Sequence, residues 1–178
     1  KALDVISALR KKDINVHVIM TKSATEFVSL LTFQSISQNL VTVSMFDEPK
    51  AWEIQHISLA KKADLFLVAP ATANIIGKVA NGIADDMLST TIMATKAKVI
   101  FAPAMNTNMY ENPILQDNLK VLASYGKQII EPASGMLACR DVGKGKMPEP
   151  EVLFQYILRV IAFEEDLADK KILVTAGP

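Results

Sequence analysis

Cysteine and histidine are scarce in this chain, and their scarcity excludes several classes of protein. Its 178 residues include one cysteine and two histidines. A single cysteine, Cys139, cannot form a disulfide within the chain, and so few soft ligands argue against a structural zinc site. The sequence therefore predicts no metal site and favours a reducing, cytoplasmic location.

The chain also lacks an excess of charge and any long hydrophobic run. Nineteen basic residues balance nineteen acidic ones, and no block of like charge stands out, so neither nucleic acid nor a membrane is expected as a partner. The apolar runs are too short to span a bilayer. No G-x-G-x-x-G occurs, which argues against a plain nicotinamide-binding Rossmann domain. Half the residues are hydrophobic, as expected of one globular domain.

Short apolar runs alternate with segments of helical spacing along the chain. We predict buried strands at 14–21, 63–70, 96–103 and 127–132, and a further strand near the C-terminus. The predicted helices are 1–13, one that Ser23 caps with Glu26 as a capping box, 58–62, 74–80, one that begins at Asp85-Asp86, 112–125 and 151–163. Residues 135–150 are expected to form a loop or flap. This alternation predicts an α/β fold with a doubly wound parallel sheet.

Two predicted strands end at proline and run into small and amide-bearing residues. The first continues as PATAN (Pro70 to Asn74) and the second as PAMNTNMY (Pro103 to Tyr110). Ligands of open α/β sheets bind beyond the carboxyl ends of the strands. These two segments are therefore expected to form a site for a flat ligand with polar edges.

Several side chains near this site have both a structural and a chemical interpretation. His56 precedes a strand in an irregular segment and is the better acid/base candidate, whereas His17 lies within an apolar run and is expected to pack in the core. Asn74 and Asn106 either cap helices or hold carbonyl and carboxylate groups of a ligand. Cys139 is either an inert small residue or part of a closing flap.

Four motifs in this order resemble the homo-oligomeric flavin-containing cysteine decarboxylases. They are HISLAKKAD, PATANIIGKVANGIADDML, PAMNTNMYENP and ACRD. Within that family, the chain is most similar to the phosphopantothenoylcysteine decarboxylase domains of bacterial bifunctional coenzyme A biosynthesis flavoproteins. The final TAGP resembles the start of their phosphopantothenate–cysteine ligase domain. We therefore expect a decarboxylase domain at 1–166, and a linker with the start of a ligase domain at 167–178.

The resemblance implies a three-layer, Rossmann-like fold of the flavodoxin type. It also implies FMN bound at the subunit interface of a homotrimer, with trimers assembled into a dodecamer. The expected substrate is 4′-phosphopantothenoylcysteine, which loses CO2 to give 4′-phosphopantetheine. In the family scheme, flavin first oxidises the substrate cysteine and later returns the electrons, so the reaction is redox-neutral overall.

Site residues follow from the resemblance position by position. His56 matches the acid/base histidine, and Cys139 matches a flap cysteine that helps to protonate the ene-thiol product. The residues expected to bind substrate are Asn106, Ala138, Arg140 and Lys146. The residues expected to bind the cofactor are Thr72, Ala73, Asn74, Ser89, Met105 and Met109.

The chain departs from the family pattern at several points. Arg140 replaces a usual glycine, Lys146 a usual arginine, and Tyr110 a usual tryptophan. Members also begin with a strand and a turn ending like GGIAAYKAL, of which only the last three letters occur here, so part of the flavin-phosphate site is expected to be missing. Alternative functions are a peptidyl-cysteine decarboxylase, a non-catalytic regulatory flavoprotein and a flavin prenyltransferase.

Overall fold

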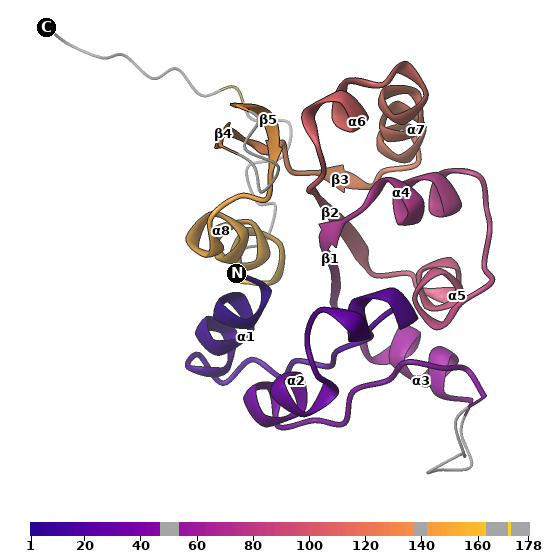
Figure 1. Ribbon diagram of the computed structural model, residues 1–178. Helices are drawn as coiled ribbons and strands as arrows, with labels where there is room; N and C mark the ends of the chain where they lie inside the picture. Colours follow the sequence, from indigo (N-terminus) through magenta and orange to yellow (C-terminus); the bar gives the residue numbers. More distant parts are fainter. Residues whose placement is uncertain (47–53, 137–141, 163–170, 172–178) are drawn as a thin grey trace, which may run out of the picture.

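Helices cover both faces of a parallel sheet in the computed structural model, which describes residues 1–46, 54–136, 142–162 and 171 (Figure 1). The sheet has the spatial order β1-β2-β3. Its strands are β1 (Leu65–Ala71), β2 (Lys98–Pro103) and β3 (Gln128–Ile129), and a separate antiparallel hairpin joins β4 (Ala133–Met136) and β5 (Val142–Lys146). The helices are α1 (Ala2–Arg10), the short 3-10 helix η1 (Lys22–Glu26), α2 (Leu30–Ser37), α3 (Gln55–Lys62), α4 (Ala73–Ala80), α5 (Met87–Ala94), α6 (Thr107–Glu111), α7 (Pro113–Ser124) and α8 (Pro150–Ile161).

The central strand β2 is buried on both faces. Val99 and Phe101 point into one hydrophobic core, while Ile100 and Ala102 point into another. Successive side chains of a strand point to opposite faces, so a strand between two helical layers must be apolar throughout. This is why residues 99–103 of the predicted run show no polar alternation.

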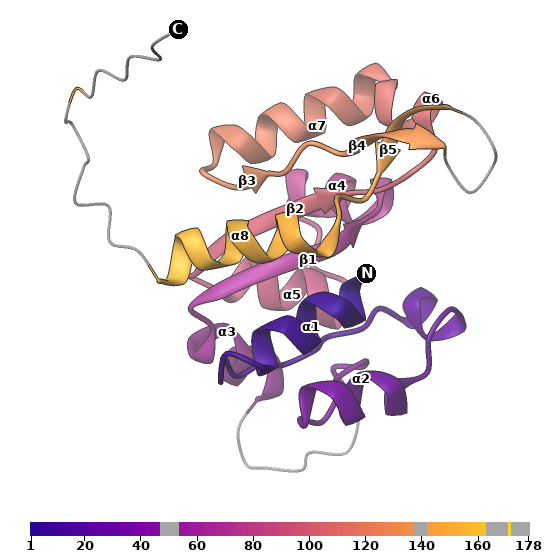
Figure 2. The same cartoon turned by 90° about the vertical axis from the view of Figure 1, so that its left-hand side faces the viewer.

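Each core is closed by its own set of helices. Apolar residues of α4, α5 and α7 pack on one face of the sheet, and those of α1 and α8 pack on the other. Figures 1 and 2 show these two groups on opposite sides of β1 and β2. The expected three-layer, doubly wound α/β fold is therefore confirmed.

Most predicted helix boundaries near the sheet are confirmed. The Asp86 carboxylate accepts the Ser89 N–H at 2.8 Å and caps α5, and Asn112 caps α7 ahead of Pro113. Helix α4 ends before Gly82, whose φ of 71° lies in the left-handed region. These boundaries follow from local chemistry, because a capping side chain or a glycine satisfies the helix end without help from the rest of the fold.

The prediction of a buried strand at 14–21 is wrong. Only Ile19 makes a ladder contact in this segment, an isolated parallel bridge to Thr42. Ile14 and Val16 are partly buried against the core of α1 and α8, whereas His17 is exposed, contrary to the expected core role. The segment packs on one face only, so its alternate residues meet solvent.

Four other predictions also need correction. Thr21 rather than Ser23 caps the helix that follows, accepting the Ala24 N–H at 3.2 Å, because the turn begins two residues earlier than expected. Part of PAMNTNMY forms α6 instead of a loop, and residues 133–146 contain a hairpin instead of an irregular flap. Helix α3 already begins at Gln55. The predicted C-terminal strand lies outside the described residues.

Candidate functional site

The two proline-ended strands bring their following loops together, as the sequence predicts. Ala71 at the end of β1 is in register with Pro103 at the end of β2. The Ala104 N–H then donates a hydrogen bond of 3.2 Å to the Ala71 carbonyl. Small side chains at both positions allow this close approach. The carboxyl edge of the sheet therefore presents both loops side by side.

The first loop opens helix α4 with backbone donors at its start. Thr72 is the N-cap residue, but its side chain makes no capping hydrogen bond. Thr72 and Asn74 are exposed, and Ala73 is half-buried. A helix start carries unsatisfied N–H groups and a partial positive charge, which suit anionic or carbonyl oxygens. The geometry is compatible with a role of these three residues in binding the cofactor, and that role stays a prediction.

The second loop carries Asn106, which caps helix α6. Its Oδ1 accepts the Asn108 N–H at 2.9 Å. The capping interpretation is therefore correct, and it fixes the plane of the amide. Beside it, Met105 packs partly against the core, whereas the side chain of Met109 is half exposed. A soft, partly exposed thioether suits the face of a flat aromatic ligand.

His56 lies apart from these loops within one chain. It sits half-buried in the first turn of α3, not in an irregular segment. Gln55 anchors that turn by donating to the Thr42 hydroxyl at 2.8 Å. Figures 1 and 2 both place α3 and α6 at opposite ends of the molecule. The chain thus brings Asn74 and Asn106 to one edge but does not bring His56 to them.

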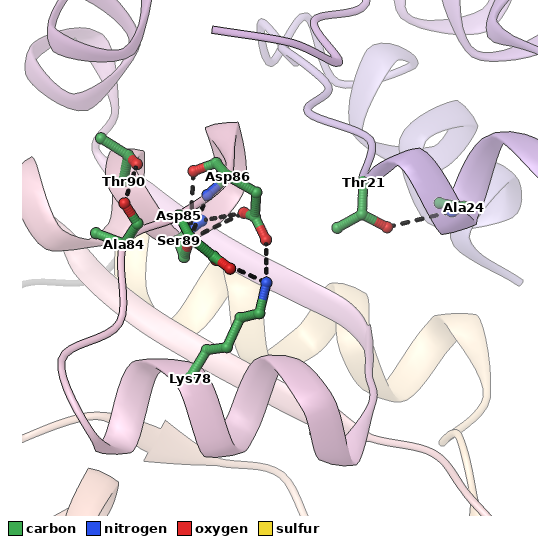
Figure 3. Close-up of polar contacts among 8 residues, drawn as sticks. All are labelled: Thr21, Ala24, Lys78, Ala84, Asp85, Asp86, Ser89 and Thr90. Atoms are coloured by element: carbon green, nitrogen blue, oxygen red, sulfur yellow. Dashed lines mark hydrogen bonds and ion pairs between the residues drawn. The ribbon is translucent and has the colours of Figure 1, made fainter.

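Ser89, predicted to contact the cofactor, is buried in a polar cluster between α4 and α5. Its hydroxyl donates to the Asp86 carboxylate at 2.9 Å and receives the Asp86 N–H, which completes a capping box. Lys78 reaches across from α4 to Asp85 at 2.6 Å and to Asp86 at 2.9 Å (Figure 3). Thr21 and Ala24 lie on a separate segment of the same view. The structure gives Ser89 a helix-capping role, and its cofactor role stays a prediction.

Opposing influences act on the carboxyl of Asp86. Burial raises its pKa, but hydrogen bonds from Ser89 and Lys78 outweigh burial, and the pKa lies below its usual value. In turn, hydrogen bonds to Asp85 and Asp86 raise the pKa of Lys78. A carboxylate with a lowered pKa stabilises the fold above its unfolded-state pKa of about 4. That stability is lost as the pH falls through the lower, folded-state pKa.

We expect Asp86→Ala to lower the free energy of unfolding by about 1 to 2 kcal/mol at pH 7, because the cap is lost. Asp85→Ala is the matched control, since it removes only an exposed ion pair with the same lysine and should cost less than about 1 kcal/mol. Urea unfolding at pH 7 and at pH 3.5 measures both. The difference in the free energy of unfolding between wild type and Asp86→Ala should be smaller at pH 3.5 than at pH 7. If this difference does not change, the loss of stability has a cause other than the carboxylate.

A cavity of about 470 Å³ lies away from the strand-end loops. Its lining includes Met93, Thr95, Tyr125 and Lys127, which precede β2 and β3 or belong to the helices before them. It therefore opens at the amino edge of the sheet, whereas ligands of this fold class bind at the carboxyl edge. Among the predicted site residues it contains Ser89 alone. We place the candidate site at the strand-end loops.

Of the remaining predicted site residues, the structure describes Lys146. Lys146 ends β5, and its ammonium group lies 3.4 Å from the Glu149 carboxylate. Ala138, Cys139 and Arg140 lie outside the described residues. Within the described ranges, no helix is long and apolar enough to cross a membrane.

Sequence reasoning missed how the hairpin contacts the Asn106 loop. The Met105 N–H donates to the Gly145 carbonyl at 3.0 Å, and the Lys144 ammonium lies 6.0 Å from the centre of the Tyr110 ring. Lys144 also pairs with Glu131 at 2.7 Å. The G-x-G spacing at 143–145 was the available signal, since glycines two residues apart lie on one face of a strand and allow close backbone approach.

Comparison with known proteins finds relatives over the whole length of this chain. The family model described as Flavoprotein matches residues 1–162. The coenzyme A biosynthesis bifunctional protein CoaBC of Bacillus subtilis is 49% identical over 180 residues, which cover 100% of this chain and 44% of that protein. A probable phosphopantothenoylcysteine decarboxylase of Streptococcus mutans is 43% identical, covering 88% of this chain and 89% of its own length. The chain thus spans under half the length of the bifunctional relative.

Solved structures agree with these sequence relatives. One is a cysteine-to-serine mutant of PPC decarboxylase complexed with pantothenoylaminoethenethiol, with a TM-score of 0.75, 31% identity, and coverage of 85% of this chain and 86% of that one. Another is the FMN-dependent cysteine decarboxylase SpaF, with a TM-score of 0.74, 25% identity, and coverage of 89% and 88%. Together with the family match, they support a flavin cofactor.

Proposed function

We propose that this chain, which belongs to the Flavoprotein family, binds FMN and removes CO2 from 4′-phosphopantothenoylcysteine to give 4′-phosphopantetheine. The observation that carries the proposal is the junction of the two strand-end loops, tied by the Ala104–Ala71 hydrogen bond. It brings the start of α4, at Thr72 to Asn74, and the loop that carries Asn106 to the same edge of the sheet. The relatives named for this reaction support the choice of substrate.

The residues at this edge fit a flavin. The hydroxyl and amide of Thr72 and Asn74, with the N–H groups at the start of α4, suit the carbonyl and phosphate oxygens of FMN. The small side chain of Ala73 leaves room for a flat ring, and Met105 and Met109 offer apolar contact. When bound, FMN supplies a reversible two-electron acceptor for the cysteine portion of the substrate.

The polar residues have separate roles in the proposed reaction. The Asn106 amide donates hydrogen bonds to the substrate carboxylate and orients it for loss as CO2. His56 exchanges a proton with the substrate as the acid/base group. Cys139 supplies the proton that the ene-thiolate left by CO2 loss takes up when it is reduced to the product, while Lys146 and Arg140 attract the anionic substrate. Because the product is formed without net oxidation, no external reductant is consumed.

We also propose that the site is completed between subunits of a homotrimer. The separation of α3 from α6 within one chain supports this arrangement, because His56 then meets the Asn106 loop of a neighbouring copy. Assembly of trimers into a dodecamer, a cytoplasmic location and a ligase domain beginning within 167–178 belong to the same proposal. The bifunctional relatives support the last of these.

The proposal is tested by incubating the flavin-loaded protein with 4′-phosphopantothenoylcysteine and following the products by mass spectrometry. We expect a product that has lost CO2, and none from the flavin-free protein. A peptide that ends in cysteine is tested in parallel. Turnover of the peptide alone would replace the proposed substrate, and turnover of neither by protein with flavin bound would indicate a regulatory flavoprotein.

A further inference from the structure

Strand β5 lies directly against the backbone that carries Asn106. The Met105 N–H donates to the Gly145 carbonyl at 3.0 Å, and α6 packs against β5. Both views show the hairpin beside the start of α6 (Figures 1 and 2). This contact joins two segments about 40 residues apart in the sequence, outside the regular sheet.

Gly145 allows this approach because it has no side chain. A Cβ at this position would lie 2.2 Å from the Met105 carbonyl oxygen, far inside van der Waals contact. Its φ of 153° is also one that residues with side chains rarely adopt. The Met105 N–H is itself bonded to the Gly145 carbonyl, so Met105 cannot shift away as a whole without losing that hydrogen bond.

Gly143 makes the matching contact on the other side of Asn106. A Cβ there would lie 2.5 Å from Oγ1 and 2.8 Å from Cγ2 of Thr107, the first residue of α6. The Thr107 hydroxyl is buried, and no hydrogen-bond partner for it occurs in the described part of the chain. The obstacle at Gly143 is therefore a side chain, whereas the obstacle at Gly145 is backbone.

We propose that Gly143 and Gly145 are positioning residues for Asn106. They lie two residues apart on one face of β5 and contact Met105 and Thr107, the residues on either side of Asn106. The contact holds the backbone of Asn106 while its side chain is oriented by the Asn108 cap. This inference rests on the proposed role of Asn106 in binding the substrate carboxylate.

Gly135 provides a matched control within the same hairpin. It pairs with Gly143 across the ladder, and its φ of 155° is close to that of Gly145. A Cβ at Gly135 would meet only the Lys146 side chain, at an ordinary distance of 3.9 Å. Alanine at either position introduces similar backbone strain, but only Gly145→Ala also pushes against the Asn106 loop.

The first experiment compares kcat and KM of the flavin-loaded Gly145→Ala and Gly135→Ala variants with 4′-phosphopantothenoylcysteine. We expect kcat/KM of Gly145→Ala to fall about 100-fold, as for a displacement of about 1 Å. Most of the loss should appear in KM, because Asn106 holds the bound carboxylate. Gly135→Ala should stay within about twofold of wild type, and both variants should keep their flavin absorbance. Equal losses in the two variants would assign the effect to strain and overturn the proposal.

The second experiment uses rescue at Gly143, which a general loss of folding would not show. Gly143→Ala alone should raise KM, because its new methyl group meets Oγ1 and Cγ2 of Thr107. Adding Thr107→Ala removes both atoms and leaves only the Cβ, 3.1 Å away. We expect the double variant to recover most of the lost kcat/KM, and Thr107→Ala alone to change it by less than about threefold. No recovery would overturn the proposed contact.

A third comparison separates this inference from the proposed function. If wild type releases no CO2, the proposed function fails, and the positioning role that rests on it fails as well. If wild type turns over and Asn106→Asp does so equally well, Asn106 does not bind the carboxylate. In that case, a kcat/KM that falls only in Gly145→Ala has a cause other than Asn106. The proposed positioning of Asn106 would then be wrong, and the proposed decarboxylase activity would stand.

Discussion

Replacing His56 with asparagine is expected to slow CO2 release from 4′-phosphopantothenoylcysteine by about 100-fold to 10,000-fold, while flavin stays bound. Asparagine keeps a polar side chain of similar reach in the first turn of α3 but cannot exchange a proton near neutral pH. Helix α3 does not contain the predicted flavin-binding loop, so the flavin absorbance should be unchanged. Mass spectrometry of the products over time measures the rate.

His17→Asn is the natural control for this substitution, because the chain has only these two histidines. His17 is exposed and shares a contact of 3.3 Å with Asn15. Desolvation of the ring, with a contribution from the positive charge of Lys62, lowers its pKa. We expect normal turnover from His17→Asn. Normal turnover from His56→Asn would instead remove His56 from the mechanism.

The second large effect is the recovery of activity when two inactive variants are mixed. Asn106→Asp should lose turnover because its carboxylate repels that of the substrate, yet aspartate still caps helix α6 well. If each site takes His56 from one copy and Asn106 from its neighbour, random trimers of this variant with His56→Asn contain intact sites. About a quarter of the interfaces would then be intact. Co-expressing both variants and measuring turnover per flavin tests this expectation.

The controls follow from the same arrangement. Each single variant expressed alone should stay inactive. The double variant, which carries both His56→Asn and Asn106→Asp, should be inactive as well. A mixture prepared without subunit exchange should also remain inactive. If His56 and Asn106 serve one site within a single chain, every mixture stays inactive, and the proposed interface site is wrong.

The fold could be predicted where local chemistry is sufficient. The apolar run at 99–103 needs helical layers on both faces, and Asp86 and Asn112 cap their helices with their own side chains. The structure of the segment at 14–21 could not be predicted in this way. Its exposure depends on which of its faces has a neighbour, and this is a property of the tertiary arrangement.

The candidate site likewise has parts that the sequence predicts and parts that depend on the tertiary arrangement. Strand polarity predicts that the loops after Pro70 and Pro103 meet, and the register of β1 and β2 confirms it. The contact of Gly145 with Met105 joins a hairpin to a distant loop, and the sequence contains only the G-x-G spacing as a sign of it. The distance between α3 and α6 likewise depends on how whole layers pack, and the motif order says nothing about it.

The two-sided burial of β2 makes the two halves of the molecule independent in their packing. Ile100 and Phe101 are adjacent in the chain and fully buried, yet they belong to different cores. Residues without shared partners contribute almost additively to stability. Substitutions in α8 therefore need compensating changes in α1 but not in α4 or α7. The layer of α4, α5 and α7, which packs behind the site loops, can stay constant while the layer of α1 and α8 diverges.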